Sequence, residues 1–439
     1  MSNSQPRQLS VMCSGIDVQR TPNESGLLST PQMDRPLRVL IAEESSGVGG
    51  STISLCGLLE HLDPRQFTPF VVFSRPDQQG YCERTLGTKV DTTVITRGTW
   101  PKQWPLTQWV KRIAERIHPS VARAMDKAIA LLDILAWDIP YAIRIAQYGR
   151  NKKIDVYLDN DAIMPTPVLA SRLLRAPLVV IQRGAPWQSP MVRYLARRVA
   201  MAAGNSATTR NELAALDIPA DRLTIIFPPL DIRRFNPGVD SSAKRSEFGV
   251  PDDVPCFGIF GNLDAWKGHA IFLRAVREVI DNVPNAMAFV VGAPLKGREG
   301  MLAELSSLCE QLRISNSVVF TGFRRDTPQM MAMMDVVVHA STTPEPFGRV
   351  IIEAMAVGRP VIATRPGGPA EIIEDGETGF LVEPGDPGAI ADRVLELFSD
   401  RDRAAAVGRR AAADVVIRFS AESQAQNLAN ALVRAWKDV

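Results

Sequence analysis

The sequence has few of the residues that build metal sites or disulfide frameworks. Its 439 residues include only five cysteines and four histidines, and no two cysteines form a CxxC pair. The cysteines are far apart, at Cys13, Cys56, Cys82, Cys256 and Cys309. An odd number of scattered cysteines favours neither a disulfide framework nor a zinc site. We therefore expect no structural metal.

Long hydrophobic runs are also missing. The nearest candidate, residues 128–146, is interrupted by two aspartates, a proline and an arginine. It therefore falls short of the roughly 20 apolar residues that cross a bilayer. The first 34 residues are polar and lack the apolar core of a signal peptide. This composition predicts a disordered tail on a cytoplasmic protein.

Excess charge of one sign is missing from the chain as a whole but not from its halves. The net charge is only +2, yet residues 35–232 carry 25 Lys/Arg against 18 Asp/Glu, while residues 233–439 carry 23 against 27. The length predicts two domains of about 200 residues each. The first, basic domain is the one we expect to meet an anionic partner. We expect no nucleic-acid partner.

The most informative stretch is residues 335–364. A β-branched run at Val336 opens it, and a polar, proline-containing loop follows. A helical pattern begins near Gly348 and stops at Gly358, and a second β-branched run begins at Val361. The pattern predicts a strand–loop–helix–strand unit of a parallel sheet, in which ligands gather at the carboxyl ends of the strands.

Two glutamates mark this unit as a candidate ligand site. Glu353 lies in an apolar helix, where a carboxylate is unfavourable unless a group hydrogen-bonds to it, and ligand hydroxyls would satisfy it. Glu345 lies in the preceding loop, and the amides of Phe347 and Gly348 open the helix as an anion site suited to phosphate. The alternative is a surface glutamate and a glutamate paired within the structure.

At these residues the sequence resembles a known family. The segment from Glu345 to Glu353, followed by Ala-Met-Ala-x-Gly-x-Pro-Val, is similar to the paired-glutamate signature of the group 1 glycosyltransferases. The segments starting at Gly367-Gly368 and at Asp375-Gly376 also fit that family. The resemblance spans roughly residue 37 to the C-terminus and is strongest in the second half. It implies an α/β protein of the GT-B fold, with two Rossmann-like domains facing across a cleft and a C-terminal helix returning to the N-terminal domain.

The resemblance also implies a domain plan and a reaction. The plan is a tail (1–34), an N-terminal acceptor domain (35–232), a C-terminal nucleotide-sugar donor domain (233–418) and a final helix (419–439). The reaction is retaining transfer of a hexose-type sugar from a nucleoside-diphosphate sugar to a glycan or lipid-linked acceptor. No cofactor and no metal are expected, because a lysine and a helix dipole carry the charge stabilisation.

The resemblance assigns roles to individual residues. Glu353 would bind the ribose hydroxyls and Glu345 the hydroxyls of the transferred sugar. Lys267, which follows a predicted strand and precedes a helix, would neutralise the diphosphate. The expected catalytic residues are Lys267, Glu345 and Arg183, and the expected donor-binding residues are Gly261, Asn262, Arg324, Phe347, Gly348, Val350 and Glu353.

The first half begins with a strand, a glycine-rich turn and a helix. The buried run Leu37–Ala42 is followed by a turn that contains Gly47, Gly49 and Gly50. This order is typical of the first Rossmann-like unit. We expect Gly49 and Gly50 to face the cleft, with a simple tight bend as the alternative. Further strands are predicted at residues 70–73, 154–158, 178–181, 223–227, 257–260, 288–291 and 317–320.

Residues 97–153 differ from the rest of the first half. They hold 11 Lys/Arg against four Asp/Glu, with Trp100, Trp104, Trp109 and Trp137 among them. Basic helices with interfacial aromatics bind anionic membranes, which predicts a peripheral protein at the inner face of the plasma membrane. Ordinary packing helices with a solvated basic face are the alternative. The triplet Asp159-Asn160-Asp161 imitates a metal-binding motif but lies in the domain opposite the expected donor site.

Three departures from the family pattern bear on activity. Asn262 stands where the family usually has an arginine, and Gln182-Arg183 stands where many members have a histidine. At the hinge, Pro228-Pro-Leu-Asp231 replaces the family's usual Asn-Gly-Val-Asp. We hypothesise that Arg183 restores part of the missing charge across the closed cleft. The departures leave open a catalytically degenerate GT-B protein that binds a nucleotide-sugar or scaffolds a partner transferase. A nucleotide-sugar epimerase is the less favoured enzyme alternative.

Overall fold

A computed structural model gives the structure of the protein, and Arg35–Val439 forms one compact unit. The structure describes residues 34–45, 47–97, 109, 112–113, 118–294 and 297–437. The predicted N-terminal tail lies outside the described residues, except for Asp34.

The first half forms a seven-stranded parallel sheet in the order β3-β2-β1-β4-β5-β6-β7. Its strands are β1 (Leu37–Glu43), β2 (Phe67–Phe73), β3 (Asp91–Val94), β4 (Val156–Asp159), β5 (Leu178–Gln182), β6 (Met201–Gly204) and β7 (Leu223–Ile225). Its helices are α1 (Gly50–Glu60), α2 (Pro76–Leu86), α4 (Pro119–Asp133), α5 (Ile139–Asn151), α6 (Pro165–Leu174), α7 (Pro190–Ala196) and α8 (Ala207–Ala214). The apolar runs of β1, β4 and β5 are buried throughout or nearly so, as expected for strands covered by helices on both faces.

The second half forms a six-stranded parallel sheet in the order β10-β9-β8-β11-β12-β13. Its strands are β8 (Cys256–Phe260), β9 (Met287–Val291), β10 (Val318–Gly322), β11 (Val336–His339), β12 (Val361–Thr364) and β13 (Phe380–Val382). Its helices are α9 (Ser242–Glu247), α10 (His269–Asn282), α11 (Gly300–Gln311), α12 (Thr327–Ala332), α13 (Arg349–Ala356), α14 (Pro369–Ile372), α15 (Pro387–Ser399) and α16 (Arg401–Phe419). Alternate β11 residues enter different cores, Val337 one and Val338 the other, so the sheet is packed on both faces.

The observed elements match the predicted strand–loop–helix–strand unit closely. β11, α13 and β12 begin and end within about two residues of the expected positions. Three strands were not predicted: β3, β6 and β13. The sequence of β3 is Asp-Thr-Thr-Val and that of β6 is Met-Ala-Ala-Gly, and neither contains a run of large apolar residues. The proline, glycine and serine content of residues 229–251 predicts an interdomain linker, and this segment contains the short helix α9.

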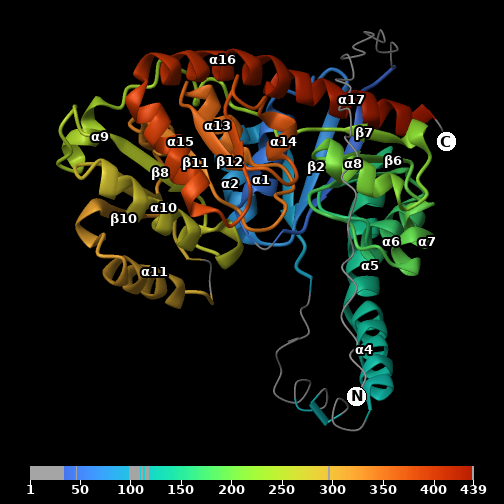
Figure 1. Cartoon of the computed structure of the whole chain (residues 1–439). Helices are drawn as coiled ribbons and strands as arrows, with labels where there is room; N and C mark the ends of the chain where they lie inside the picture. The colour runs from blue at the N-terminus through green and yellow to red at the C-terminus, as the bar shows by residue number, and fades with distance from the viewer. Residues whose placement is uncertain are drawn as a thin grey trace. The chain divides into compact units, whose positions relative to one another are not determined.

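The C-terminal helix returns to the first half, as predicted. Helix α16 packs on α13 of the second half, and the following α17 (Ala421–Lys437) packs on α1 and along β4, β5 and β6 (Figure 1). At the bend between them, the Phe419 carbonyl accepts a hydrogen bond of 2.8 Å from the Leu230 amide. The Phe419 ring also packs against Phe227 and Phe347. These contacts tie the two halves together beside α13.

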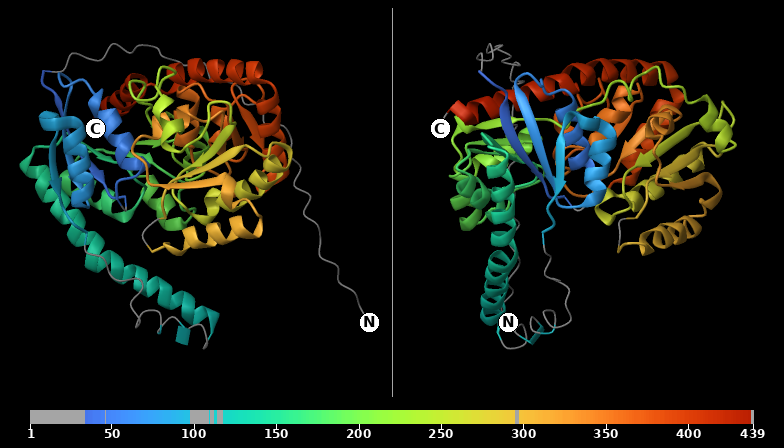
Figure 2. Two further views of the ribbon diagram at one scale, coloured as in Figure 1. Left: turned by 90° about the vertical axis from the view of Figure 1, so that its left-hand side faces the viewer. Right: turned by 180° about the vertical axis from the view of Figure 1, so that it is seen from behind.

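Helix α4 continues through a π-helical segment, Ile134–Asp138, into α5. α5 packs on α6, whereas α4 extends away from the first sheet (Figure 2). We call α4, the π-helical segment and α5 together the rod. Its Leu131, Leu132 and Leu135 are each more than half exposed. Part of the predicted membrane-binding segment, including Trp100 and Trp104, lies outside the described residues. Within the described part of the chain, no helix combines the length and the apolar character needed to cross a membrane.

Candidate active site

Lys267 and Glu345 form an ion pair where the second sheet's strands end. Lys267 closes the 3-10 turn Ala265–Lys267 that follows β8, and Glu345 lies in the loop after β11. Lys267 Nζ donates to Glu345 Oε2 across 2.6 Å and lies 3.9 Å from the centroid of the Trp266 ring. Glu345 is only 8% exposed. The structure therefore brings together two residues that the sequence assigned from separate motifs.

Two further side chains contact the same carboxylate. His339 Nε2 lies 3.1 Å from Glu345 Oε2, and the Ser341 hydroxyl donates to that oxygen across 3.1 Å. Burial alone would raise the pKa of Glu345. The hydrogen bond to His339 and the charge of Lys267 outweigh burial and lower the pKa to about 2. We call Lys267, His339, Ser341 and Glu345 the Glu345 cluster.

Glycines allow the loops of the Glu345 cluster to approach one another. The Gly368 amide donates to the Glu345 carbonyl across 2.8 Å, and a Cβ added at Gly367 would lie 2.2 Å from that carbonyl oxygen. Gly268, next to Lys267, has φ +74°, and a Cβ there would lie 1.8 Å from the Ala340 carbonyl oxygen. Both positions exclude a side chain. The glycines of these two motifs therefore bring the lysine loop and the glutamate loop together.

Helix α13 begins beside the Glu345 cluster with no side-chain cap. Its N-cap is Gly348, in the left-handed region with φ +104°. The amides of a helix's first turn have no partner within the helix, so they point out as an anion site. The Phe347 side chain is buried among Phe227 and Phe419 and so fixes the start of the helix. Val350 is partly buried and packs against the same core.

Arg349 is the side-chain partner of Glu353 in this structure. Arg349 Nη2 donates to Glu353 Oε1 across 2.7 Å, one helical turn away. Its Nη1 donates to the Gly50 carbonyl of the glycine-rich turn across 3.1 Å. Gly50 thus faces the second half of the molecule, and its neighbour Gly49 is the N-cap of α1. The helix that carries Glu353 contacts the glycine-rich turn through Arg349.

Glu371 makes a second contact between the halves. Its carboxylate accepts hydrogen bonds of 2.6 Å and 2.7 Å from the amides of Ala207 and Thr208. These amides open α8 of the first half, so a second-half carboxylate lies at the positive end of a first-half helix.

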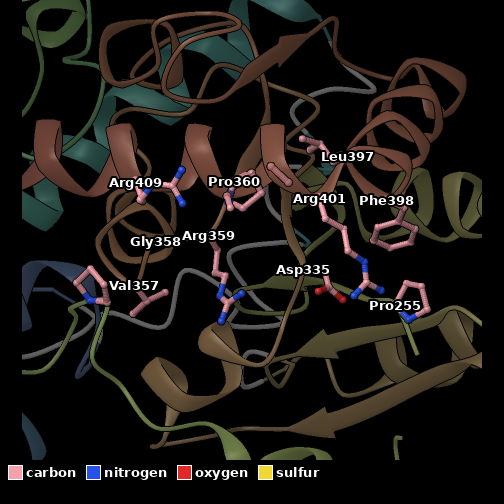
Figure 3. Close-up of a pocket in the computed structure, with 13 residues that line it drawn as sticks. Pro255, Asp335, Val357, Gly358, Arg359, Pro360, Leu397, Phe398, Arg401 and Arg409 are labelled. Atoms are coloured by element: carbon pink, nitrogen blue, oxygen red, sulfur yellow. The ribbon is translucent and has the colours of Figure 1, made fainter. Parts of the chain in front are cut away.

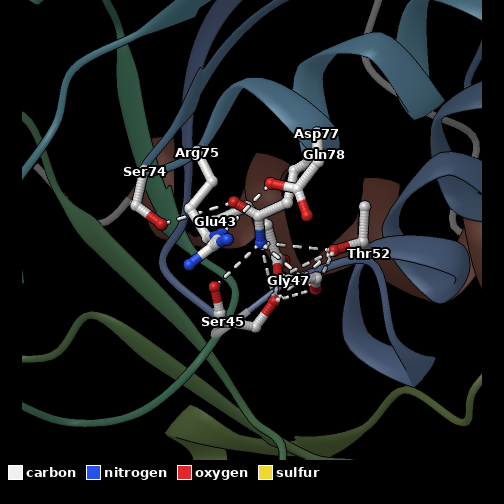
Figure 4. Close-up of polar contacts among 8 residues, drawn as sticks. All are labelled: Glu43, Ser45, Gly47, Thr52, Ser74, Arg75, Asp77 and Gln78. Atoms are coloured by element: carbon white, nitrogen blue, oxygen red, sulfur yellow. Dashed lines mark hydrogen bonds and ion pairs between the residues drawn. The ribbon is translucent and has the colours of Figure 1, made fainter. Parts of the chain in front are cut away.

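The first sheet also ends in a buried carboxylate, Glu43 at the end of β1. It accepts hydrogen bonds from Ser51 at 3.1 Å and Thr52 at 3.3 Å, and further ones from Ser45 and Asn160. A side chain of α2 also contacts the turn after β1: the side-chain amide of Gln78 donates to the Ser45 carbonyl across 3.0 Å (Figure 4). Neutral donors, rather than a cation, therefore hydrogen-bond to this carboxylate.

Arg183 is buried at this first-sheet edge. It donates to Asn160 Oδ1, and burial lowers its pKa to about 10, although Glu43 and Asp161 act against the shift. Among the described residues, Arg183 makes no hydrogen bond or ion pair with Lys267 or Glu345. Burial raises the pKa of Asp159 well above its usual value and also raises that of Asp161. Within the described ranges, no group of three or more His, Cys, Asp or Glu side chains is placed to hold a metal ion.

The family model for "Glycosyl transferases group 1" matches residues 240–414, which contain the Glu345 cluster and α13. This part of the chain is therefore similar to the group 1 glycosyltransferases.

Curated relatives and solved structures are similar to this chain over part or most of its length. The chain is 35% identical to D-inositol 3-phosphate glycosyltransferase of Corynebacterium jeikeium over 47% of this chain and 50% of that protein. It is 27% identical to the lipopolysaccharide core biosynthesis mannosyltransferase LpsB of Rhizobium meliloti over 60% of this chain and 74% of that protein. The chain spans about half the length of the first curated relatives it matches. Anabaena HepE in complex with UDP-glucose has a TM-score of 0.72 and 26% identity, covering 90% of this chain and 98% of that one.

The GT-B fold expected from the resemblance is therefore confirmed, with two parallel Rossmann-like sheets. Two of the expected donor-binding residues lie apart from the Glu345 cluster. Arg324 pairs with Asp326 and Glu247, so its guanidinium is engaged by two carboxylates. The Asn262 side chain is exposed, and within the described chain it makes no hydrogen bond. The backbone of Gly261 is close to Gly292, where a Cβ would lie 1.8 Å from the Gly261 carbonyl oxygen.

Sequence reasoning missed His339, Ser341 and Arg349. His339 ends β11, the edge at which ligands gather, and Ser341 lies two residues later. Arg349 precedes Glu353 by four residues, the spacing of a helical ion pair. Both signals were present in the sequence.

Proposed function

We propose that the protein is a retaining glycosyltransferase. It moves a hexose-type sugar from a nucleoside-diphosphate sugar to a hydroxyl of a glycan or lipid-linked acceptor. The observation that carries this proposal is the Lys267–Glu345 pair beside the uncapped start of α13. A lysine and free helix amides together suit a diphosphate.

The ion pair suggests how the donor is bound. The diphosphate takes Lys267 as its counter-ion and the α13 amides as hydrogen-bond donors. Glu345, released from Lys267, then accepts hydrogen bonds from the hydroxyls of the transferred sugar. His339 and Ser341 hold the Glu345 carboxylate in place during this exchange. In the donor complex, the ribose hydroxyls donate to the Glu353 carboxylate, with Arg349 as its second partner.

The reaction needs no dedicated base on the protein. The acceptor oxygen attacks the anomeric carbon on the face from which the diphosphate leaves. The bond between that carbon and the diphosphate oxygen breaks, and the acceptor proton passes to the departing phosphate. Lys267 and the helix amides stabilise the negative charge that develops there, and in this proposal no metal ion is required.

The donor base and acceptor class are proposed from the relatives. The HepE structures contain UDP and UDP-glucose, so uridine nucleotides are the first donors to test. The name of LpsB refers to lipopolysaccharide core synthesis, which supports a surface glycan or glycolipid as the product.

The test is calorimetric titration with UDP, GDP and ADP in EDTA, which removes free divalent cations. We expect one nucleotide to bind the wild type, and Glu353→Gln to bind it about tenfold more weakly after losing a charged hydrogen bond to the ribose. Glu396→Gln is the control, since Glu396 pairs with Arg393 and Arg403 on α15 and α16. No binding of any nucleotide by the wild type would contradict the proposal.

A non-catalytic GT-B protein is the second candidate. The exposed Asn262, where the family usually has an arginine, and the buried Arg183, engaged within the first sheet, favour it. Transfer of sugar by the purified chain alone, followed by chromatography of the product, excludes this candidate. Nucleotide binding without transfer supports it.

We also propose that the protein binds the inner face of the plasma membrane. Exposed Leu131, Leu132 and Leu135 on the rod, within the strongly basic residues 97–153, support this proposal. Co-sedimentation with vesicles that contain anionic lipid tests it, and Leu131→Asp with Leu135→Asp should weaken binding. Equal sedimentation of this variant and the wild type would contradict the proposal.

A further inference from the structure

The second half has a pocket at the edge of its sheet opposite the Glu345 cluster. Pro255 precedes β8, Asp335 precedes β11 and Pro360 precedes β12, so these residues lie at the amino ends of the strands. The cavity has a volume of about 300 Å³ and is drawn in Figure 3. We call it the arginine pocket, because Arg359, Arg401 and Arg409 line it.

Positive charge in the arginine pocket is not balanced. The one carboxylate in its lining, Asp335, already accepts hydrogen bonds from the Cys256 amide at 2.7 Å and from Arg245 at 3.4 Å. Across the described chain, none of the three lining guanidinium groups has a hydrogen bond or ion pair. In Figure 3 the side chains of Arg359 and Arg401 extend from different elements into the space where Asp335 lies.

Arg359 is the most enclosed of these three cations. Its Nε is buried and has no hydrogen-bond partner. Burial lowers its pKa, the charge of Asp335 opposes this shift, and the nearby Arg245 adds to it. A buried cation without a partner is unfavourable, and an anion that reaches it recovers the lost solvation.

The rest of the lining is apolar. Pro255, Leu397 and Phe398 form a wall beside Arg401, with Ala404 and Ala405 on α16. A guanidinium pair binds phosphate through paired hydrogen bonds, and an apolar wall suits a ring or a short carbon chain. We propose that the arginine pocket binds a phosphorylated small molecule, with its phosphate on Arg359 and Arg401 and its remainder against Phe398.

This pocket is separate from the proposed donor site but shares two elements with it. α13 carries Glu353 and ends at Val357 and Gly358, which line the pocket. β11 begins directly after Asp335, which lines the pocket, and ends at His339 in the Glu345 cluster. The eight residues of α13, which span about 12 Å, separate the loop of Glu345 from Val357 in the pocket, and Glu353 is the part of the proposed donor site nearest to it.

The test is calorimetric titration of the full chain with inorganic phosphate and with phenyl phosphate. The ring of phenyl phosphate can pack on the apolar wall, so we expect tighter binding than for inorganic phosphate. Arg401 is exposed at the start of α16, so Arg401→Gln leaves the core intact. We expect this variant to bind phenyl phosphate about tenfold more weakly.

Two controls separate this pocket from general charge and from the proposed donor site. Arg410→Gln changes the next position after Arg409, but Arg410 donates to the Glu377 carbonyl outside the pocket, and wild-type affinity is expected. Lys267→Gln removes the cation of the Glu345 cluster and should leave the pocket affinity unchanged. Three results would overturn the proposal: equal affinity of Arg401→Gln and wild type, loss of binding in Lys267→Gln, or no binding to the wild type.

Discussion

The two sheets end in buried carboxylates that are stabilised differently. Glu345 in the second half has a cation, Lys267, as its partner, whereas hydroxyl and amide groups satisfy Glu43 in the first half. Lys267 can exchange this carboxylate for a phosphate, and His339 and Ser341 still hydrogen-bond to Glu345 afterwards. Neutral donors offer no such exchange. The difference indicates that the second edge is built to bind an anion, and the first edge to hold its glycine-rich turn in place.

Removing the cation of the second edge should have the largest effect. Lys267→Gln removes the charge that stabilises the departing diphosphate, so we expect transfer to slow by about 10²- to 10³-fold. Single-turnover kinetics with the donor identified by calorimetry measure this rate. Lys244→Gln is the matched control, because Lys244 pairs with Glu247 and Asp326 away from the Glu345 cluster. A transfer rate within twofold of wild type would remove Lys267 from the mechanism.

The sequence predicted the residues of the second edge that lie in short motifs. It did not predict contacts that depend on which strands are neighbours in a sheet. Lys267 and Glu345 lie in motifs with glycines at positive φ, and those glycines specify the backbone that brings them together. The partner of Arg183 depends on β4 and β5 being neighbours in the sheet, which strand patterns do not specify. Its predicted role across the cleft therefore could not be judged from residue type alone.

The surroundings of Asn262 and Arg324, two expected donor-binding residues, were likewise not visible in the sequence. The family pattern predicted both at the donor site from their place after a strand. Arg324 is instead engaged by Asp326 and by Glu247 of α9, a helix that fell inside the predicted linker. Side-chain partners that come from unpredicted elements are not visible in a motif.

The Glu345 cluster should make the protein sensitive to acid. The pKa of Glu345 falls from its ordinary 4.5 to about 2, so its contribution to stability is present above about pH 4.5 and is lost as the pH falls toward 2. Glu345→Gln removes this contribution, about 2–3 kcal/mol at neutral pH. Chemical denaturation at pH 3 and pH 7 should show a smaller difference for the variant than for wild type. An unchanged pH dependence would contradict the assignment.

Glu44 directly follows Glu43 at the end of β1, and it should make the stability of the protein depend on pH in the opposite direction. Burial raises the pKa of Glu44 to about 7, so the folded state favours its neutral form. That contribution is fully present below about pH 4.5 and is lost as the pH rises through 7. Glu44→Gln keeps the side chain neutral and should be more stable than wild type at pH 8, by about 2 kcal/mol.

The control for Glu44 is Glu310→Gln on the exposed face of α11. This variant should follow the wild-type stability at every pH. If Glu44→Gln also follows it between pH 5 and pH 8, the first edge does not carry the neutral carboxyl that distinguishes it from the second.

The smallest effect on stability is expected at the contact between Arg349 of α13 and the glycine-rich turn. Arg349→Ala removes the hydrogen bonds to the Gly50 carbonyl and to Glu353, and it leaves Glu353 without a cation. Because this pair is partly exposed, we expect a loss of only about 1 kcal/mol in stability. Arg393→Ala removes a surface pair with Glu396 and serves as the control. A loss of nucleotide affinity in Arg349→Ala beyond that of Glu353→Gln would show that the contact between the halves, rather than the Glu353 pair alone, supports the donor site.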